Sequence, residues 1–286
     1  MMENNMILNR LFTQNVLLNL INSDKKSRDT YTAIVKRFVD DYKSKDNGTL
    51  ISEVYQFMSK SYRNEYIYQN TLLNKLLLGR HSLKTTTALT QIPIGKSKAD
   101  FILINGKAVV YEIKTELDTF ERLKTQLNDY YRGFNHVCVV TSKGQYEKAQ
   151  ELLNETPVGI YILNDDNRIS LTFRKEPVEY NDLLEHSVIF KYLHKSEFEA
   201  ILLEYYKTLP VTTQVYYYGE CLQWFKKIPM ATAYNMVLRQ LKQRNHIEQT
   251  TFEKVPYELK SLIYFSNPQK YDLAKLREFW NMEYRG

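Results

Sequence analysis

The sequence contains little of what stabilises secreted domains or spans membranes. Only 2 of its 286 residues are cysteine, and Cys138 and Cys221 lie far apart and outside the spacing of zinc ligands. Neither a disulfide framework nor a zinc site is therefore expected. No apolar run of about 18 residues occurs, which argues against a membrane span. The N-terminus lacks a basic stretch followed by an apolar one, as a secretory signal would have. We expect a cytoplasmic protein with no membrane partner.

Helix-breaking residues are also scarce, and charge is only mildly unbalanced. The chain has 9 glycines and 7 prolines, which favours long helices. Its formal net charge is +6, and a basic balance favours a polyanionic partner such as nucleic acid. The basic residues are spread along the chain with no polybasic tail. A nucleic-acid surface would therefore have to be assembled by folding, and an ordinary solvated surface explains the charge equally well.

Hydrophobic periodicity changes twice along the chain. Apolar residues at spacings of three and four predict helices over 1–60, with a break at Asn47-Gly48, and a further helix over 65–79 that ends at Gly79. Strands then alternate with helices, which predicts an α/β sheet. The strands are expected in "TALTQIPI", "ADFILI", "AVVYEIK", "HVCVVTS", "VGIYILN" and "RISLTFR", and the helices over 117–133 and 144–155.

Beyond Pro177 the strand pattern ceases and amphipathic helices separated by prolines follow. The sequence thus predicts a helical N-terminal extension over 1–60, an α/β core over 61–176 and a helical C-terminal domain over 177–286. The last segment is within the usual size of a domain.

Charged residues interrupt the apolar strands at three positions. Glu112 and Lys114 are two apart and so project from one strand face. A two-residue turn at Asn105-Gly106 would turn Asp100 away from them. A three-residue turn that pairs residue 103 with residue 107, with Gly106 left-handed, would set Asp100 opposite Val110 and diagonal to Glu112. We predict this second arrangement, or a β-bulge with the same effect.

Two carboxylates so placed can share a divalent ion. Diagonal cross-strand neighbours have α-carbons about 7–8 Å apart, and hard oxygen ligands suit Mg²⁺ or Mn²⁺. A lysine beside the metal would stabilise negative charge that grows during phosphodiester hydrolysis. By spacing alone, however, a solvated strand face with Glu112 and Lys114 paired to each other is the commoner explanation.

Context favours the catalytic alternative. Asp100 followed by Glu112-Ile113-Lys114 resembles the PD-(D/E)XK nuclease superfamily, whose restriction-endonuclease-like core runs α-β-β-β-α-β. The expected elements from residue 65 to residue 142 have that order. Gln126 and Tyr130, in "QLNDY", resemble the Q-x-x-x-Y element of the RecB-type branch, and their spacing places them on one helix face. The resemblance covers about residues 61–176.

The resemblance implies a role for each matching residue. Asp100, Glu112 and the main-chain carbonyl of Ile113 would bind Mg²⁺ or Mn²⁺, and Lys114 would orient or activate the attacking water. Gln126 and Tyr130 would support the site or contact the phosphate backbone. The family often has proline before its aspartate, where this chain has Ala99.

Residues at the two ends of the helix over 65–79 are further candidates. Some members of the superfamily add an acid from the preceding helix, for which Glu65 is the candidate. A favourable interaction of Glu65 with the helix dipole explains that residue equally well. Arg80 and His81 follow the same helix and could touch phosphate, although a polar surface turn explains them at least as well.

The sequence thus leads to a divalent-metal-dependent nuclease that acts on DNA in preference to RNA. Resemblance to bacterial proteins suggests a role in defence or repair. The rival interpretation is a catalytically silent module on the same fold that binds nucleic acid or a protein. A protein partner or a homo-oligomer would form through the helical extensions.

Overall fold

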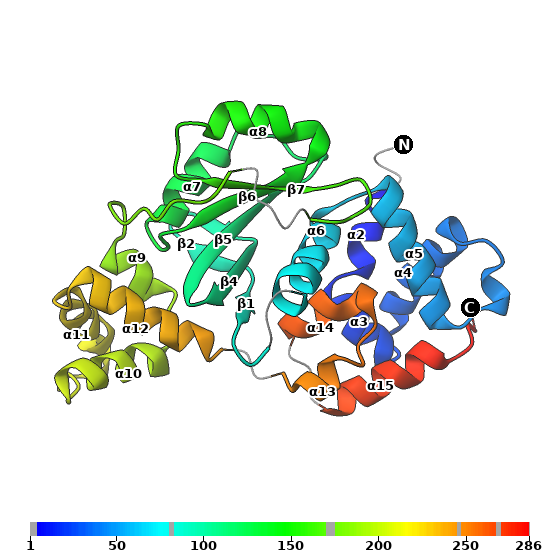
Figure 1. The fold of residues 1–286 in the computed structure, drawn as a ribbon. Coiled ribbons are helices and arrows are strands. Elements are labelled where there is room, and N and C mark those ends of the chain that lie inside the picture. The colour runs from blue at the N-terminus through cyan, green and yellow to red at the C-terminus, as the bar shows by residue number, and fades with distance from the viewer. Residues whose placement is uncertain (1–4, 80–82, 170–174, 245–246, 267–269, 286) are drawn as a thin grey trace.

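A computed structural model describes residues 5–79, 83–169, 175–244, 247–266 and 270–285. The chain forms a mixed α/β structure with helices toward both ends (Figure 1). The α/β class and the helical extensions predicted from the sequence are confirmed. Over these residues, no helix combines the length and the apolar character that crossing a bilayer requires.

A five-stranded mixed sheet forms the centre of the fold. Its first three strands are antiparallel and its last three are parallel, so β5 has neighbours of both kinds. Both faces of the sheet are buried, which explains why the strands are apolar at successive positions rather than at alternate ones. The strands, in spatial order, are β1 (Thr87–Leu89), β4 (Phe101–Asn105), β5 (Lys107–Lys114), β6 (Val137–Ser142) and β7 (Gly159–Leu163).

The residues between β1 and β4 in the sequence form a second sheet of two strands. It consists of β2 (Ile92–Ile94) and β3 (Ser97–Ala99), joined by a turn at Gly95, whose φ is +61°. The run "TALTQIPI" therefore forms two short strands in different sheets, where the sequence predicted one. Gln91, with φ +54°, lies between them and redirects the chain.

Helices from both ends of the chain cover one sheet face. In Figure 1 the blue N-terminal helices and the orange to red C-terminal helices lie side by side, and α15 contacts both α3 and α5. Their apolar side chains form one cluster with Phe101, Tyr111 and Tyr161 of the sheet. These helices are α2 (Leu8–Leu11), α3 (Gln14–Ile21), α4 (Lys25–Phe38), α5 (Asn47–Ser61), α6 (Glu65–Leu72), α13 (Gln249–Phe252), α14 (Lys260–Ser266) and α15 (Lys270–Asn281).

Helices from the middle of the chain build a second apolar cluster with Ile102, Val110 and Val139 on the opposite side of the sheet. They are α7 (Leu123–Tyr131), α8 (Tyr146–Leu153), α9 (His186–Lys191), α10 (Lys195–Tyr206), α11 (Gln214–Lys226) and α12 (Met230–Lys242). Of these, α7, α8 and α12 contact the strands. Residues after Pro177 therefore contribute to both clusters. In the second cluster α12 packs on β4 and α9–α11 pack on α12 or on each other, whereas α13–α15 belong to the first cluster.

Several predicted boundaries differ from the observed ones. Asn47-Gly48 was predicted as a break but begins α5, after a short 3₁₀ turn over Tyr42–Ser44. The helix predicted over 65–79 ends in a π-helical segment over Leu73–Leu78. The helix predicted from residue 117 begins at Leu123. The last predicted strand lies mostly outside the described residues, although Ile169 and Lys175 each bridge to β7.

Candidate active site

The β4–β5 hairpin brings Asp100 and Glu112 to one face, but not in the predicted register. Residue 105 pairs with 107 and residue 101 with 111, around Gly106 with φ +74°. Extending this ladder by one residue sets Asp100 directly opposite Glu112, rather than opposite Val110. The predicted pairing of 103 with 107 is therefore wrong. The left-handed Gly106 and the shared face, which the metal hypothesis needed, are both present.

β5 changes from apolar to polar along one face. Ala108 and Val110 belong to the apolar cluster under α7, and Glu112 and Lys114 continue the same face. The Glu112 side chain is only 1% exposed and that of Lys114 only 9%, and the Lys114 ammonium lies 2.8 Å from the Glu112 carboxylate. Such a buried pair is stable only if its remaining hydrogen-bonding capacity is also satisfied.

α7 supplies those remaining contacts. The Lys114 Nζ donates to Gln126 Oε1 at 2.9 Å. The Tyr130 hydroxyl lies 2.5 Å from Glu112 Oε2 and 2.8 Å from the carbonyl of Lys98 in β3. Gln126 and Tyr130 reach β5 together because residues four apart lie one above the other on a helix. The pair predicted from "QLNDY" thus contacts the predicted acid and lysine.

Asp100 is held where the chain bends between β3 and β4. Its Oδ2 accepts a hydrogen bond from the main-chain N–H of Ile113 at 2.9 Å. Its own carbonyl accepts hydrogen bonds from Thr90 Oγ1 at 2.7 Å and from Gln69 Nε2 at 3.2 Å. Neither Thr90 nor Gln69 was predicted as a site residue from the sequence. Gln69 could have been predicted, because it lies one helical turn after Glu65 and so on the same helix face. No sequence pattern points to Thr90.

Glu65 begins α6, and its carboxylate is close enough to interact electrostatically with Glu112, Lys114 and Asp118. Surrounding protein raises the pKa of Glu65, and Asp118 and Glu112 raise it further, although part of its side chain remains exposed to water. Burial likewise raises the pKa of Asp100 well above its ordinary value, and Glu112 and Glu65 add to the shift. Glu112 therefore disfavours the charged forms of both Glu65 and Asp100 in this cluster.

A divalent cation fits this donor set. Oxygen ligands from Asp100, Glu112 and the main chain are those that Mg²⁺ prefers, and a cation would relieve the mutual repulsion of the acids. Over the described part of the chain, no three His, Cys, Asp or Glu side chains are grouped closely enough to hold a metal unaided. A metal at this site would therefore be coordinated by two carboxylates together with main-chain or water oxygens.

A second set of polar residues stabilises the loop that follows β5. Asp118 accepts hydrogen bonds from the N–H and the hydroxyl of Thr115. Gln145 donates to the carbonyls of Thr115 and Asp118. This turn explains why α7 begins later than predicted. The spacing Thr115-x-x-Asp118 is a local sequence pattern from which such a turn could have been predicted.

Arg63 supports the same loop from the α6 side. Its side chain is 8% exposed, and its guanidinium lies 3.4 Å from the Glu116 carboxylate and donates to the carbonyl of Leu163. Tyr68 of α6 also donates to Glu116. The proposed phosphate contacts of Arg80 and His81 lie outside the described residues.

Comparison with known proteins gives one match. No curated protein and no solved structure matches the chain. The model of one protein family, described as bacteriophage P4 protein cII, matches residues 58–262 and so includes the central sheet, the acidic cluster, α9–α13 and the start of α14. The chain therefore belongs to the bacteriophage P4 protein cII family.

Proposed function

We propose that the protein is a divalent-metal-dependent nuclease of the PD-(D/E)XK type that hydrolyses phosphodiester bonds, with DNA as its preferred substrate. The observation that supports this most is the contact of Glu112 and Lys114 with each other and with Tyr130 and Gln126, beside Asp100. The order α6, β1, β4, β5, α7, β6, with the β2–β3 hairpin inserted after β1, supports the proposal because the α-β-β-β-α-β order is the one expected of a restriction-endonuclease-like core.

Each residue would have a distinct task. Asp100, Glu112 and the carbonyl of Ile113 would hold Mg²⁺ or Mn²⁺, with Glu65 as an outer acid. The bound ion would supply Lewis acidity and a water of lowered pKa. Lys114 would stabilise negative charge that grows on the phosphate, and Gln126 fixes the position of its ammonium. Tyr130 orients Glu112 and connects it to β3.

The test is digestion of linear, circular and single-stranded DNA, and of RNA, with Mg²⁺, Mn²⁺ or EDTA. We expect wild-type protein to cut DNA with metal and not with EDTA. Asp100→Asn should slow cleavage at least about 10²-fold, since it removes a charged ligand. The same change should keep or raise the melting temperature, because one acid of a crowded cluster becomes neutral. Glu151→Gln, an exposed change on α8, should behave as wild type.

Lys114→Ala is a less specific test. It should also abolish cleavage, but it leaves the buried Glu112 without its cation, which typically costs about 3–5 kcal/mol. Asp100→Asn is therefore the decisive variant. If it cuts DNA as fast as wild type, the proposed metal site is wrong.

A silent binding module is the second candidate. It is favoured by the observation that Glu112, Lys114, Gln126 and Tyr130 already satisfy one another without a substrate or metal. If wild-type protein binds DNA, with an affinity that falls as salt rises, but never cuts with either metal, this alternative replaces the nuclease.

A further inference from the structure

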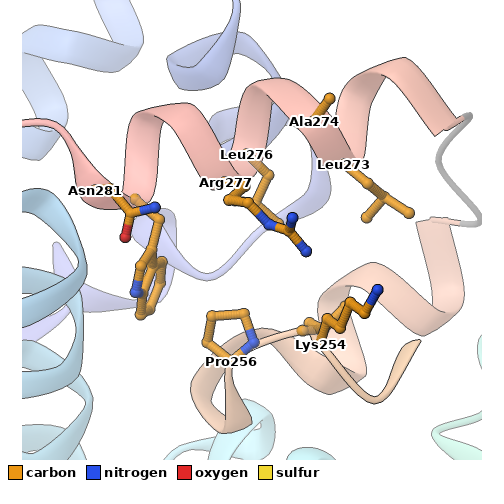
Figure 2. A pocket seen from close by; sticks show the side chains of 9 residues that line it. Lys254, Pro256, Leu273, Ala274, Leu276, Arg277 and Asn281 are labelled. Carbon is orange, nitrogen blue, oxygen red and sulfur yellow. The ribbon is translucent and has the colours of Figure 1, made fainter. Parts of the chain in front are cut away.

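A pocket lies far along the chain from the acidic cluster and shares no residue with it. It opens between α15 and the segment that precedes α14 (Figure 2) and has a volume of about 500 Å³. Cavities that bind small molecules typically measure about 300–1,000 Å³. The pocket is lined by Lys254, Val255, Pro256, Leu273, Ala274, Leu276, Arg277, Trp280 and Asn281.

Two cations face each other across this opening. In Figure 2 the side chains of Lys254 and Arg277 extend from opposite walls into the space between them. Both residues are exposed, and no carboxylate is among the residues that line the described pocket. Two positive charges at one opening repel each other, and an anion between them would turn that repulsion into attraction.

The floor and one end of the pocket are apolar. Val255 and Leu276 are buried beneath it, while Pro256 and Leu273 are only partly covered. Trp280 lines the same pocket and is held by α5, because its indole ring lies where a side chain at residue 48 would be. The absence of a side chain at Gly48 therefore leaves room for the Trp280 ring, which forms an aromatic side of the pocket.

We infer that this pocket binds a nucleoside phosphate. The phosphate would lie between Lys254 and Arg277, and the base would cover the apolar floor next to Trp280. Asn281 offers both a donor and an acceptor to the edge of the base. A single anionic group joined to one flat ring system matches two cations at one opening better than an extended acidic peptide does. The source of this group would be a free nucleotide or the terminal nucleotide of a strand.

Isothermal titration of the full-length protein tests this inference. The probes are AMP, GMP, adenosine, inorganic phosphate and a 5′-phosphorylated single-stranded oligonucleotide. We expect the nucleotides to bind more tightly than adenosine or phosphate alone. Lys254→Gln and Arg277→Gln should each weaken binding by about tenfold or more, since each removes a charge-assisted hydrogen bond. Lys226→Gln, an exposed lysine on α11, should leave binding unchanged.

Fluorescence gives a second measurement that needs no change in the pocket. The chain has 2 tryptophans, so Trp224→Phe leaves Trp280 as the only tryptophan emitter. A nucleotide should change its emission, and inorganic phosphate should change it less. Tighter binding of the oligonucleotide than of AMP would identify a strand end as the source, and the reverse order would identify free nucleotide.

Three results would overturn the inference: no nucleotide binding at millimolar concentration, binding that Lys254→Gln and Arg277→Gln leave intact, or equal affinity for phosphate and AMP. The outcome is independent of the nuclease proposal, because these variants leave Asp100 and Glu112 unchanged. Metal-dependent cleavage of DNA by the same variants measures that activity separately.

Discussion

At the scale of single residues, buried charge in this protein occurs in close pairs. Glu112 contacts Lys114 in the central sheet. Glu197 of α10 contacts Arg244, with a closest distance of 2.6 Å and side chains that are 9% and 12% exposed. Removing one member of a buried pair costs much more than the pair contributes, because the other charge remains in a poorly solvated place. Substitution of either member of such a pair should therefore destabilise the protein.

Glu197→Gln should lower the free energy of unfolding by about 3 kcal/mol at neutral pH. Arg244 forms two hydrogen bonds to Glu197, and the N–H of His194 forms another. Burial alone would raise the pKa of Glu197, but these contacts outweigh burial and lower it. The contribution of the ionised acid is therefore complete above its ordinary pKa of 4.5. It is lost as the pH falls through the lower folded value.

Urea denaturation of wild type and variant at several pH values measures this effect. The difference in stability between the two proteins should shrink below pH 4.5. Glu204→Gln is the matched control, because its pair with Arg239 is about half exposed on both sides. It should cost no more than about 1 kcal/mol. Equal losses in the two variants would contradict the distinction between buried and exposed pairs.

At the scale of elements, the β2–β3 hairpin is hydrogen-bonded to the part of α7 that carries Tyr130, one of the predicted site residues. Asp129 of α7 accepts hydrogen bonds from the N–H of Lys96 and the hydroxyl of Ser97. Its neighbour Tyr130 bonds both Lys98 and Glu112. The hairpin is therefore fixed to the helix that carries two predicted site residues, and a change in its turn should alter the site.

Gly95→Ala and Gly106→Ala form a matched pair that tests this connection. Both glycines have positive φ, at +61° and +74°, which costs alanine about 1–2 kcal/mol. A side chain at residue 95 would also collide with Asp129, whereas nothing lies within 4 Å at residue 106. Gly95→Ala should therefore lose more stability than Gly106→Ala, and more of any cleavage activity. The measurements are the melting temperature and the cleavage rate of each variant. Equal losses in the two variants would show that the hairpin does not support the site.

At the scale of the whole molecule, the two ends of the chain form one packed unit. Asn47 is buried at the start of α5 and accepts a hydrogen bond from the Tyr31 hydroxyl. Its amide donates to the carbonyls of Phe279 and Met282, more than 200 residues away in sequence. The N-terminal helices therefore depend on α15 for their packing and for their hydrogen bonds.

Asn47→Ala should lower the free energy of unfolding by about 1–3 kcal/mol, because it leaves the buried Tyr31 hydroxyl without its partner and removes two side-chain hydrogen bonds to carbonyls near the C-terminus. Asn15→Ala, an exposed change on α3, should cost little. Urea denaturation followed by circular dichroism and by tryptophan fluorescence provides the measurement. A loss in Asn47→Ala no larger than that in Asn15→Ala would show that the two ends are not coupled.

The sequence alone determined the features that depend on local periodicity. It predicted the alternation of strands and helices, and it placed Glu112 with Lys114 and Gln126 with Tyr130, because fixed spacings put side chains on one face of a strand or helix. It failed at the ends of elements. Asp118 and Thr115 form a turn before α7 through side-chain hydrogen bonds to the main chain, which compete with helical hydrogen bonding.

Only the tertiary structure decided which distant segments meet. The register that sets Asp100 opposite Glu112 depends on one residue in the turn, and a slip of one residue would move the carboxylate to the other sheet face. The contacts of Thr90 and Gln69 with Asp100, and of Gly48 with Trp280, join segments that no local pattern relates. Such contacts form because each sheet face must be covered by whichever helices the chain can bring to it. Composition and periodicity show that a face is apolar, but they do not show which segment covers it.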